Sequence, residues 1–214
     1  MRVSLAHSAL KKAHFTYTKH LEIHMATAKA LTTAEVEQVL QFISQSANAE
    51  RNKLMFMMTV LAGLRVSEVA GLMIGDVRNE NGTIRSEVFL SANRVKHNHA
   101  RTLYINTRLQ QELEAYIATK TWYDATQPLF STLRGSKCAF SANTMTQYFY
   151  WLYKKAGIKG ASSHSGRKTF LTSLASQGIS VFVLASLAGH KSITTTQRYI
   201  AVNADLNRRA VELV

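Results

Sequence analysis

The 214-residue sequence contains a single cysteine, Cys138, and a single proline, Pro128. One cysteine cannot form a disulfide within the chain and there is no Cys-x-x-Cys pair, so the composition favours a reducing, cytoplasmic compartment. The longest apolar run, around residues 54–64, is too short to cross a bilayer, which takes about 20 residues. The N-terminus also lacks the continuous hydrophobic region of a secretion signal. We therefore expect neither export nor insertion into a membrane.

Several motifs of phosphoryl-transfer chemistry are also missing. The chain has no cluster of carboxylates for two Mg²⁺ ions, no glycine-rich phosphate loop ending in Gly-Lys-Ser, and no His-Glu-x-x-His. A metal-dependent nuclease is therefore disfavoured, and we expect no metal site.

Acidic residues are scarce, and this imbalance indicates the partner. Against 26 Lys and Arg there are only 13 Asp and Glu, which gives a formal net charge of +13 and a pI near 10.0. The excess is concentrated at the two ends: residues 151–214 carry nine basic and two acidic side chains, and residues 1–30 carry five and one. Clustered cations release the counterions condensed on nucleic acid, so a polyanionic partner is expected. Charge alone does not separate DNA from RNA or from an acidic membrane surface.

The periodicity of apolar residues predicts an α+β fold that is mainly α-helical with one small antiparallel β-sheet. A capping-box pattern at residues 32–35 predicts the start of the folded domain. Residues 83–92 and 101–106 read as strands joined by a hairpin loop at residues 95–100. Helical spacing covers the remaining segments, with glycines at the apparent helix ends: residues 51–63, 107–120, 143–157, 164–178, 181–189 and the stretch after Ser192.

Cations and possible proton donors occur together in the sequence. His164 and Arg167 are three residues apart at the start of a predicted helix, where one helix face and the positive end of the dipole suit a phosphate. Arg65, just after the helix-ending Gly63, could supply a second guanidinium. Each of these residues alone is more often an ordinary surface or core residue, so only the whole group indicates a site.

The segment LAGHKSITTTQRYI, residues 187–200, places His190 nine residues before Tyr199. At about 100° per residue, one continuous helix would turn these two side chains to opposite faces. If they serve one site, the chain must turn between them. Gly189 is expected to end one helix, and Ser192 to cap a second helix that carries Tyr199 back.

The order of these motifs resembles the tyrosine recombinase (phage integrase) family. The resemblance rests on GLRVSE at residues 63–68, Lys96 in a hairpin five residues before Arg101, HSGR at 164–167, LAGH at 187–190, and Tyr199. It covers about residues 30–210 and implies the catalytic-domain fold of that family, here residues 31–214. Gly166 and Lys168 depart from the Leu and His that commonly flank the second arginine in the family.

The resemblance implies a six-residue catalytic site: Arg65, Lys96, His164, Arg167, His190 and Tyr199. Tyr199 would attack a DNA phosphodiester and form a 3′-phosphotyrosyl bond, and Lys96 would protonate the departing 5′-oxygen. The two arginines would bind the non-bridging oxygens, and the two histidines would assist proton transfer and orient the phosphate. No cofactor would be needed. Glu68, three residues after Arg65, is expected to hold that guanidinium in place.

The function implied is site-specific DNA recombination, with double-stranded DNA as partner. The alternatives are a non-catalytic DNA-binding regulator on the same scaffold and a type IB topoisomerase. The apolar stripe in residues 201–214 either packs on its own core or, by the resemblance, docks on a neighbouring subunit of a DNA-bound homo-tetramer. DNA-bending accessory proteins are further possible partners.

Residues 1–30 form a basic arm before this catalytic domain. The arm is either a remnant of the family's core-binding domain or, because His24-Met25 resembles a cloning junction, partly foreign. The resemblance also implies a bacterial or phage-encoded protein acting in the cytoplasm at the nucleoid.

Overall fold

The computed structural model describes residues 28–91, 100–120, 124–132, 138–200 and 204–212. Lys96 and most of the basic arm lie outside these ranges. The described helices are α2 (Thr33–Ser44), α3 (Ala49–Leu61), α4 (Val66–Gly71), α5 (Ile74–Val77), α6 (Thr107–Ala118), α7 (Ala142–Lys155), α8 (Ser165–Ser176), α9 (Val181–Ala188), α10 (Ile193–Gln197) and α11 (Ala204–Val211). The predicted mainly helical fold is confirmed.

The predicted antiparallel sheet is present and has two strands, β1 (Glu87–Leu90) and β2 (Arg101–Tyr104). Val88 pairs with Leu103, and Leu90 pairs with Arg101. These four side chains are buried, because alternate residues of a strand face the same side of the sheet. The strand predicted over residues 83–92 is shorter in the structure, and Ile84 instead forms an isolated bridge with Arg78.

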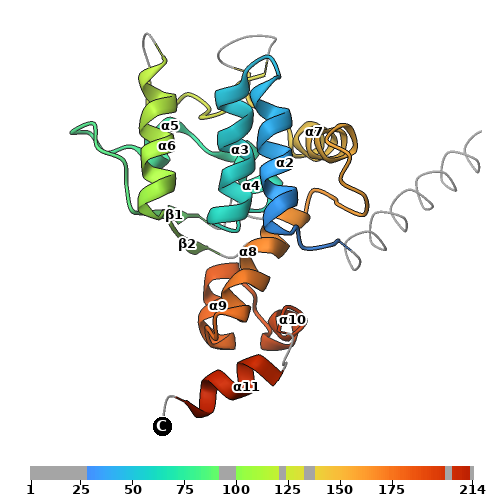
Figure 1. The fold of residues 1–214 in the computed structure, drawn as a ribbon. Helices are drawn as coiled ribbons and strands as arrows, with labels where there is room; N and C mark the ends of the chain where they lie inside the picture. Colours follow the sequence, from blue (N-terminus) through green and yellow to red (C-terminus); the bar gives the residue numbers. More distant parts are fainter. Residues whose placement is uncertain (1–27, 92–99, 121–123, 133–137, 201–203, 213–214) are drawn as a thin grey trace, which may run out of the picture.

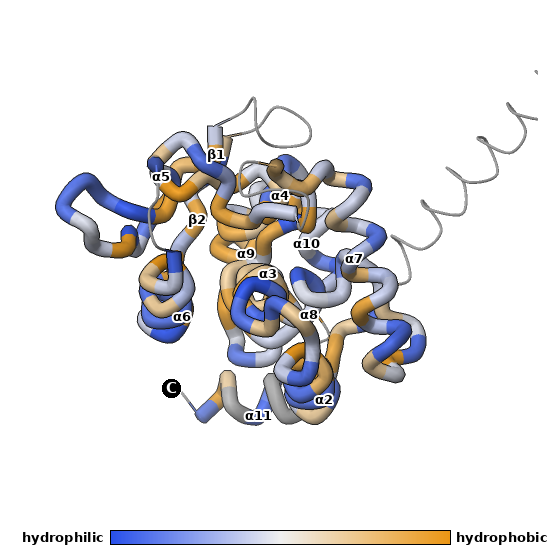
Figure 2. The backbone as a smooth tube through the Cα atoms, turned by 90° about the horizontal axis from the view of Figure 1, so that it is seen from above, coloured by the Kyte–Doolittle hydropathy of each residue, from blue (hydrophilic) through white to orange (hydrophobic). Residues whose placement is uncertain are grey.

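The main hydrophobic core surrounds α3. Figure 1 shows this helix between α2 and α6, and the view from above in Figure 2 places it in the middle of the molecule. Phe56, Met57 and Met58 are consecutive and all fully buried, so α3 is covered on every side rather than along one stripe. The capping box predicted before α2 is confirmed: Thr32 Oγ1 accepts from the Glu35 N–H at 3.2 Å, and Glu35 Oε2 accepts from the Thr32 N–H at 3.0 Å.

A second, smaller core joins α8 and α9 below the first (Figure 1). Leu171 and Ala175 on α8 pack with Leu184 and Ala188 on α9, and Tyr199 packs against this group. Because α8 also packs along α3, it connects the two cores. Four of the predicted site residues, Arg65, Arg167, His190 and Tyr199, lie close together near the end of α9.

Close contact between α3 and α8 explains one departure from the family pattern. A Cβ atom at Gly166 would lie 2.0 Å from Oγ1 and 2.7 Å from Cβ of Thr59 on α3. Carbon atoms normally stay about 3.5–4.0 Å apart, so there is no room for a side chain at residue 166 while Thr59 is opposite. The small residue next to Arg167 is therefore a requirement of helix packing.

Among the helices in the described ranges, none is both long and apolar enough to cross a membrane. Within the same ranges, no three His, Cys, Asp or Glu side chains are grouped so that they could hold a metal ion.

Candidate active site

Arg65 is placed by the turn between α3 and α4. Gly63 has a φ of +63°, a left-handed conformation that glycine adopts without strain, and the chain then enters α4 with Arg65 at its N-cap. Glu68, one turn later, accepts from Arg65 Nη1 at 2.7 Å and from the Arg65 backbone N–H at 2.8 Å. The expected contact between Glu68 and this guanidinium is present. One fifth of the Arg65 side chain remains exposed, so a ligand can reach it.

Glu68 also binds a second arginine, Arg101, which the sequence motifs used only as a spacing marker. Arg101 Nη2 donates to Glu68 Oε2 at 2.7 Å, and Arg101 Nη1 donates to the Leu187 carbonyl at 2.7 Å. Both side chains are buried, with Arg101 7% and Glu68 3% exposed. The signal that could have revealed Arg101 is its register in β2, because it shares the inward face with Leu103 and a buried guanidinium requires a partner.

Arg167, in the first turn of α8, is almost fully buried. Its Nη1 donates to the Gly63 carbonyl at 2.6 Å, and its Nη2 donates to the Ala188 carbonyl at the end of α9. Burial, and secondly the neighbouring charges of Arg65 and Arg101, lower the pKa of this guanidinium to about 9. The side chain is therefore still charged at neutral pH.

His190 follows Gly189, which ends α9 in a left-handed conformation with φ +60°, as predicted. Its Nε2 lies 3.2 Å from Arg167 Nη2, and its Nδ1 lies 2.9 Å from Thr196 Oγ1. Burial, and secondly the charge of Arg167, lower the pKa of His190 to about 4. The ring is neutral at pH 7. Because guanidinium only donates, Nε2 accepts from Arg167 and the proton is on Nδ1, where it is donated to Thr196.

Tyr199 lies against His190 in a stacked arrangement, with ring centroids 6.0 Å apart and ring planes 19° apart. The chain turns between the two residues, as their spacing predicts. One detail of the prediction was wrong: α10 ends at Gln197, so Tyr199 lies in the following turn, where its N–H donates to the Thr196 carbonyl at 2.9 Å. Ser192 precedes α10 as its N-cap residue but makes no side-chain capping hydrogen bond.

Of the other two predicted residues, the structure describes only His164. His164 is the N-cap residue of α8, one turn before Arg167, and its backbone N–H lies 3.3 Å from Ser162 Oγ. Lys96 is outside the described residues. Thr196, which orients His190, was missed by the sequence motifs, since a threonine among three consecutive threonines gives no distinguishing signal.

Positive charge therefore accumulates at the junction of α4, α8 and α9. Arg65, Arg101 and Arg167 all donate to Glu68 or to carbonyls at the ends of α3 and α9. Carbonyls at a helix C-terminus carry the negative end of the dipole and favour such cations. Three guanidiniums around one carboxylate leave an excess of positive charge, which suits an anionic group such as a phosphate.

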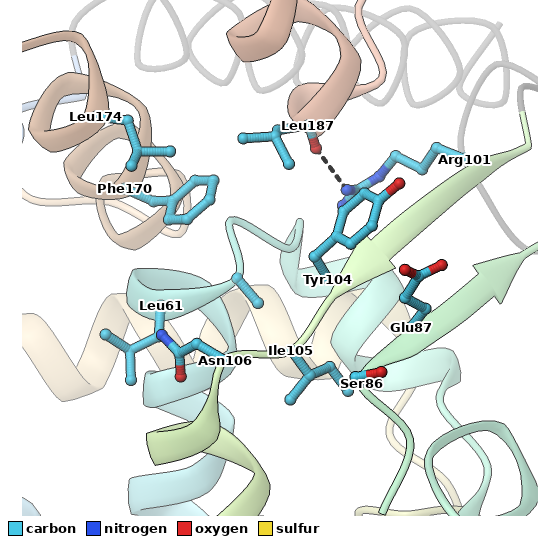
Figure 3. A pocket seen from close by; sticks show the side chains of 11 residues that line it. Leu61, Ser86, Glu87, Arg101, Tyr104, Ile105, Asn106, Phe170, Leu174 and Leu187 are labelled. Atoms are coloured by element: carbon cyan, nitrogen blue, oxygen red, sulfur yellow. Dashed lines mark hydrogen bonds between the residues drawn. The ribbon is translucent and has the colours of Figure 1, made fainter. Parts of the chain in front are cut away.

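A cavity of about 390 Å³ lies beside this cluster (Figure 3). Its wall includes Arg101 and Leu187, joined by their hydrogen bond, together with Phe170, Leu174 and Tyr104. Arg101 belongs to both the cavity and the cluster, whereas Arg65, Arg167, His190 and Tyr199 do not line the cavity. Its mainly apolar lining does not suit a phosphate, so we place the site at the arginine cluster.

The chain belongs to the phage integrase family, whose pattern matches residues 29–205. A curated relative, the tyrosine recombinase XerA of Pyrococcus furiosus, is 32% identical over 185 residues, which are 86% of this chain and 61% of the relative. The chain thus spans about three fifths of the length of this relative. Because the relative is archaeal, such similarity is not confined to bacterial and phage proteins.

Solved structures show the same fold. The crystal structure of XerA recombinase has a TM-score of 0.67 at 22% identity, over 87% of this chain and 65% of that one. The Tn1549 transposon integrase, solved in complex with circular intermediate DNA, has a TM-score of 0.65 at 26% identity, over 86% of this chain and 65% of that one. The predicted tyrosine recombinase catalytic-domain fold is confirmed.

Proposed function

We propose that residues 31–214 form the catalytic domain of a site-specific recombinase that cleaves and rejoins double-stranded DNA through a covalent 3′-phosphotyrosyl intermediate. The observation that carries this proposal is the convergence of four side chains from distant segments: Arg65, Arg167, His190 and Tyr199. Family membership and the names of the relatives support the same activity.

In the proposed reaction, Arg65 and Arg167 bind the non-bridging oxygens of the scissile phosphate. The Tyr199 hydroxyl oxygen attacks phosphorus, and a Tyr–O–P bond forms while the bond from phosphorus to the 5′-oxygen breaks. The phenolic proton passes to His164 or to water during the attack, because the neutral hydroxyl is a weak nucleophile. Lys96 donates a proton to the departing 5′-oxygen.

The two histidines assist in this scheme. His164, the N-cap residue of α8, would orient the phosphate and help move the phenolic proton. His190 is neutral and holds Arg167 through Nε2, so its direct effect is on the position of that guanidinium. Fixed donors aimed at the developing phosphate charge can supply the stabilisation that Mg²⁺ supplies in other enzymes. The covalent bond conserves the phosphodiester energy, so rejoining needs no ATP.

The C-terminal segment is proposed to join neighbouring subunits of a homo-tetramer on DNA. The described side chains of α11 from Asn207 onward are exposed in the single chain, and Val211 is 68% exposed. An apolar residue in such a position gains free energy when a second subunit covers it. DNA as substrate places the activity at the nucleoid.

Covalent trapping tests the proposal. The chain is incubated in EDTA with nicked duplex fragments from the DNA that flanks its gene, so that the released short strand diffuses away and rejoining fails. We expect a denaturation-resistant protein–DNA adduct with the wild type and none with Tyr199→Phe. A chain that binds these fragments without forming an adduct would instead be a DNA-binding regulator. Supercoil relaxation without exchange between two sites would identify a topoisomerase.

A further inference from the structure

We infer that Arg101 is a positioning residue that holds the Arg65 guanidinium ready for the phosphate through the shared carboxylate of Glu68. This inference rests on the proposed function, because it assigns a role within the same reaction. All three guanidinium nitrogens of Arg101 donate to Glu68 or to the Leu187 carbonyl, so we assign Arg101 a role through Glu68 and no contact with DNA.

The Glu68 carboxylate is fully used by the two arginines. Oε1 accepts from Arg65 Nη1 at 2.7 Å and from Arg101 Nε at 3.4 Å. Oε2 accepts from the Arg65 backbone N–H at 2.8 Å and from Arg101 Nη2 at 2.7 Å. A carboxylate has about four acceptor positions, so neither oxygen has room for another strong donor. Glu68 therefore cannot rotate about its terminal bond without losing contacts to both arginines.

Arg101 is itself anchored to the end of α9. Its Nη1 donates to the Leu187 carbonyl at 2.7 Å, and the next carbonyl, of Ala188, accepts from Arg167. A Cβ atom at Gly189 would lie 2.6 Å from Arg101 Cδ, so the aliphatic part of this side chain lies directly against the end of the helix. These contacts connect three elements of the site. Arg101 lies on β2, Arg65 is the N-cap residue of α4, and His190 follows the end of α9.

Removing Arg101 would change how Glu68 holds Arg65. The carboxylate would be left with one guanidinium, and Arg65 would rotate to fill the vacated positions on Oε1 and Oε2. That rotation turns its N–H groups from the phosphate toward Glu68 and neutralises its charge. With Arg101 present, Glu68 is shared, and one guanidinium edge of Arg65 stays available to a ligand.

The test compares single-turnover adduct formation at saturating protein on two nicked substrates. One has an ordinary scissile phosphate, and the other has a methylphosphonate, in which a methyl group replaces one charged oxygen and reduces the need for Arg65. On the phosphate we expect Arg101→Met to lower the rate constant about 10- to 100-fold, with DNA affinity unchanged. On the methylphosphonate this defect shrinks, as it does for Arg65→Ala, and the double variant is no slower than Arg65→Ala alone.

Several results would overturn the inference. A wild-type rate for Arg101→Met would do so, and so would an equal loss on both substrates, which marks a structural defect only. Arg51→Met is the matched control, because Arg51 also binds a backbone carbonyl, that of Ser131 at 2.8 Å, outside the arginine cluster. We expect it to keep the wild-type rate on both substrates.

If Arg101→Met does not fold, Arg101→Lys replaces it. A lysine keeps the charge but loses the two-pronged grip, so the same substrate dependence is expected with a smaller loss. A wild-type chain without any adduct would overturn the proposed function and this inference together. A normal wild-type adduct with unaffected Arg101 variants would overturn the inference alone.

Discussion

Replacement of Gly166 by alanine tests the packing that places Arg167. Gly166 is in the first turn of α8 and faces Thr59, which is fully buried on α3. A Cβ atom there would approach Thr59 Oγ1 to 2.0 Å and Val60 Cγ1 to 3.3 Å. Thr59 cannot move away easily, since its Oγ1 donates to the Phe56 carbonyl at 2.7 Å and its own side chain is fully buried.

Two opposing effects determine the magnitude. In a helix, alanine is more favourable than glycine by about 1 kcal/mol. An overpacked core costs about 1–3 kcal/mol, and a 2.0 Å contact is severe enough to reach the upper end of that range. We therefore expect Gly166→Ala to lower the free energy of unfolding by about 1–2 kcal/mol. Relief of the clash would move α8 away from α3 and displace Arg167, so adduct formation should slow as well.

Equilibrium unfolding in urea measures this difference, with Gly71→Ala as the matched control. Gly71 is the last residue of α4 and is exposed, and a Cβ atom there would meet nothing within 4 Å. This control should be neutral or slightly stabilising. A Gly166→Ala protein as stable as the wild type would refute the packing explanation, as would an equal loss in both variants.

Three further outcomes follow from the site and its caps. Because the folded-state pKa of His190, about 4, is below its unfolded value of 6.5, its contribution to stability is complete above pH 6.5 and lost as pH falls toward 4. After allowance for partial exposure, the free energy of unfolding should fall by about 1–2 kcal/mol over this range. Urea unfolding between pH 4 and 7 measures this fall, which His190→Asn should remove. Gly189→Ala should lower the free energy of unfolding by at least about 1 kcal/mol, because alanine is strained at a positive φ, and by more because its Cβ would meet Arg101. A melting temperature equal to that of the wild type would contradict this. Thr32→Ala should lower the free energy of unfolding in urea by about 1 kcal/mol, and an unchanged value would mean that the capping box is not stabilising.

Local signals in the sequence predict much of the fold. Thr32 and Glu35 begin α2 through hydrogen bonds within four residues, and Gly189 ends α9 by its own backbone conformation. Such features depend on near neighbours, so they can be recognised without tertiary structure. The short helix α5 (Ile74–Val77) was not predicted, because four residues are too few to show helical periodicity.

The sequence indicates four residues that the structure brings together in the proposed site, but not the network of contacts around them. The order of motifs indicates Arg65, Arg167, His190 and Tyr199, and the structure brings these four together. The contact between Glu68 and Arg101 joins positions 33 residues apart in the chain, and no local pattern encodes it.

The packing around the site is likewise not encoded by any local sequence pattern. The glycine at 166 is explained only by Thr59 on another helix. Side-chain partners across elements are set by how the helices dock, and that information is distributed over the whole core.

The most direct test of the central claim is to identify the residue that becomes linked to DNA. The trapped adduct is digested with nuclease and trypsin and analysed by mass spectrometry. We predict that the peptide ending at Arg208 carries a nucleotide on Tyr199, and that the released DNA strand has a free 5′-hydroxyl that a kinase can label. A nucleotide on another of the eight tyrosines, or a strand released with a 3′-hydroxyl instead, would contradict the account.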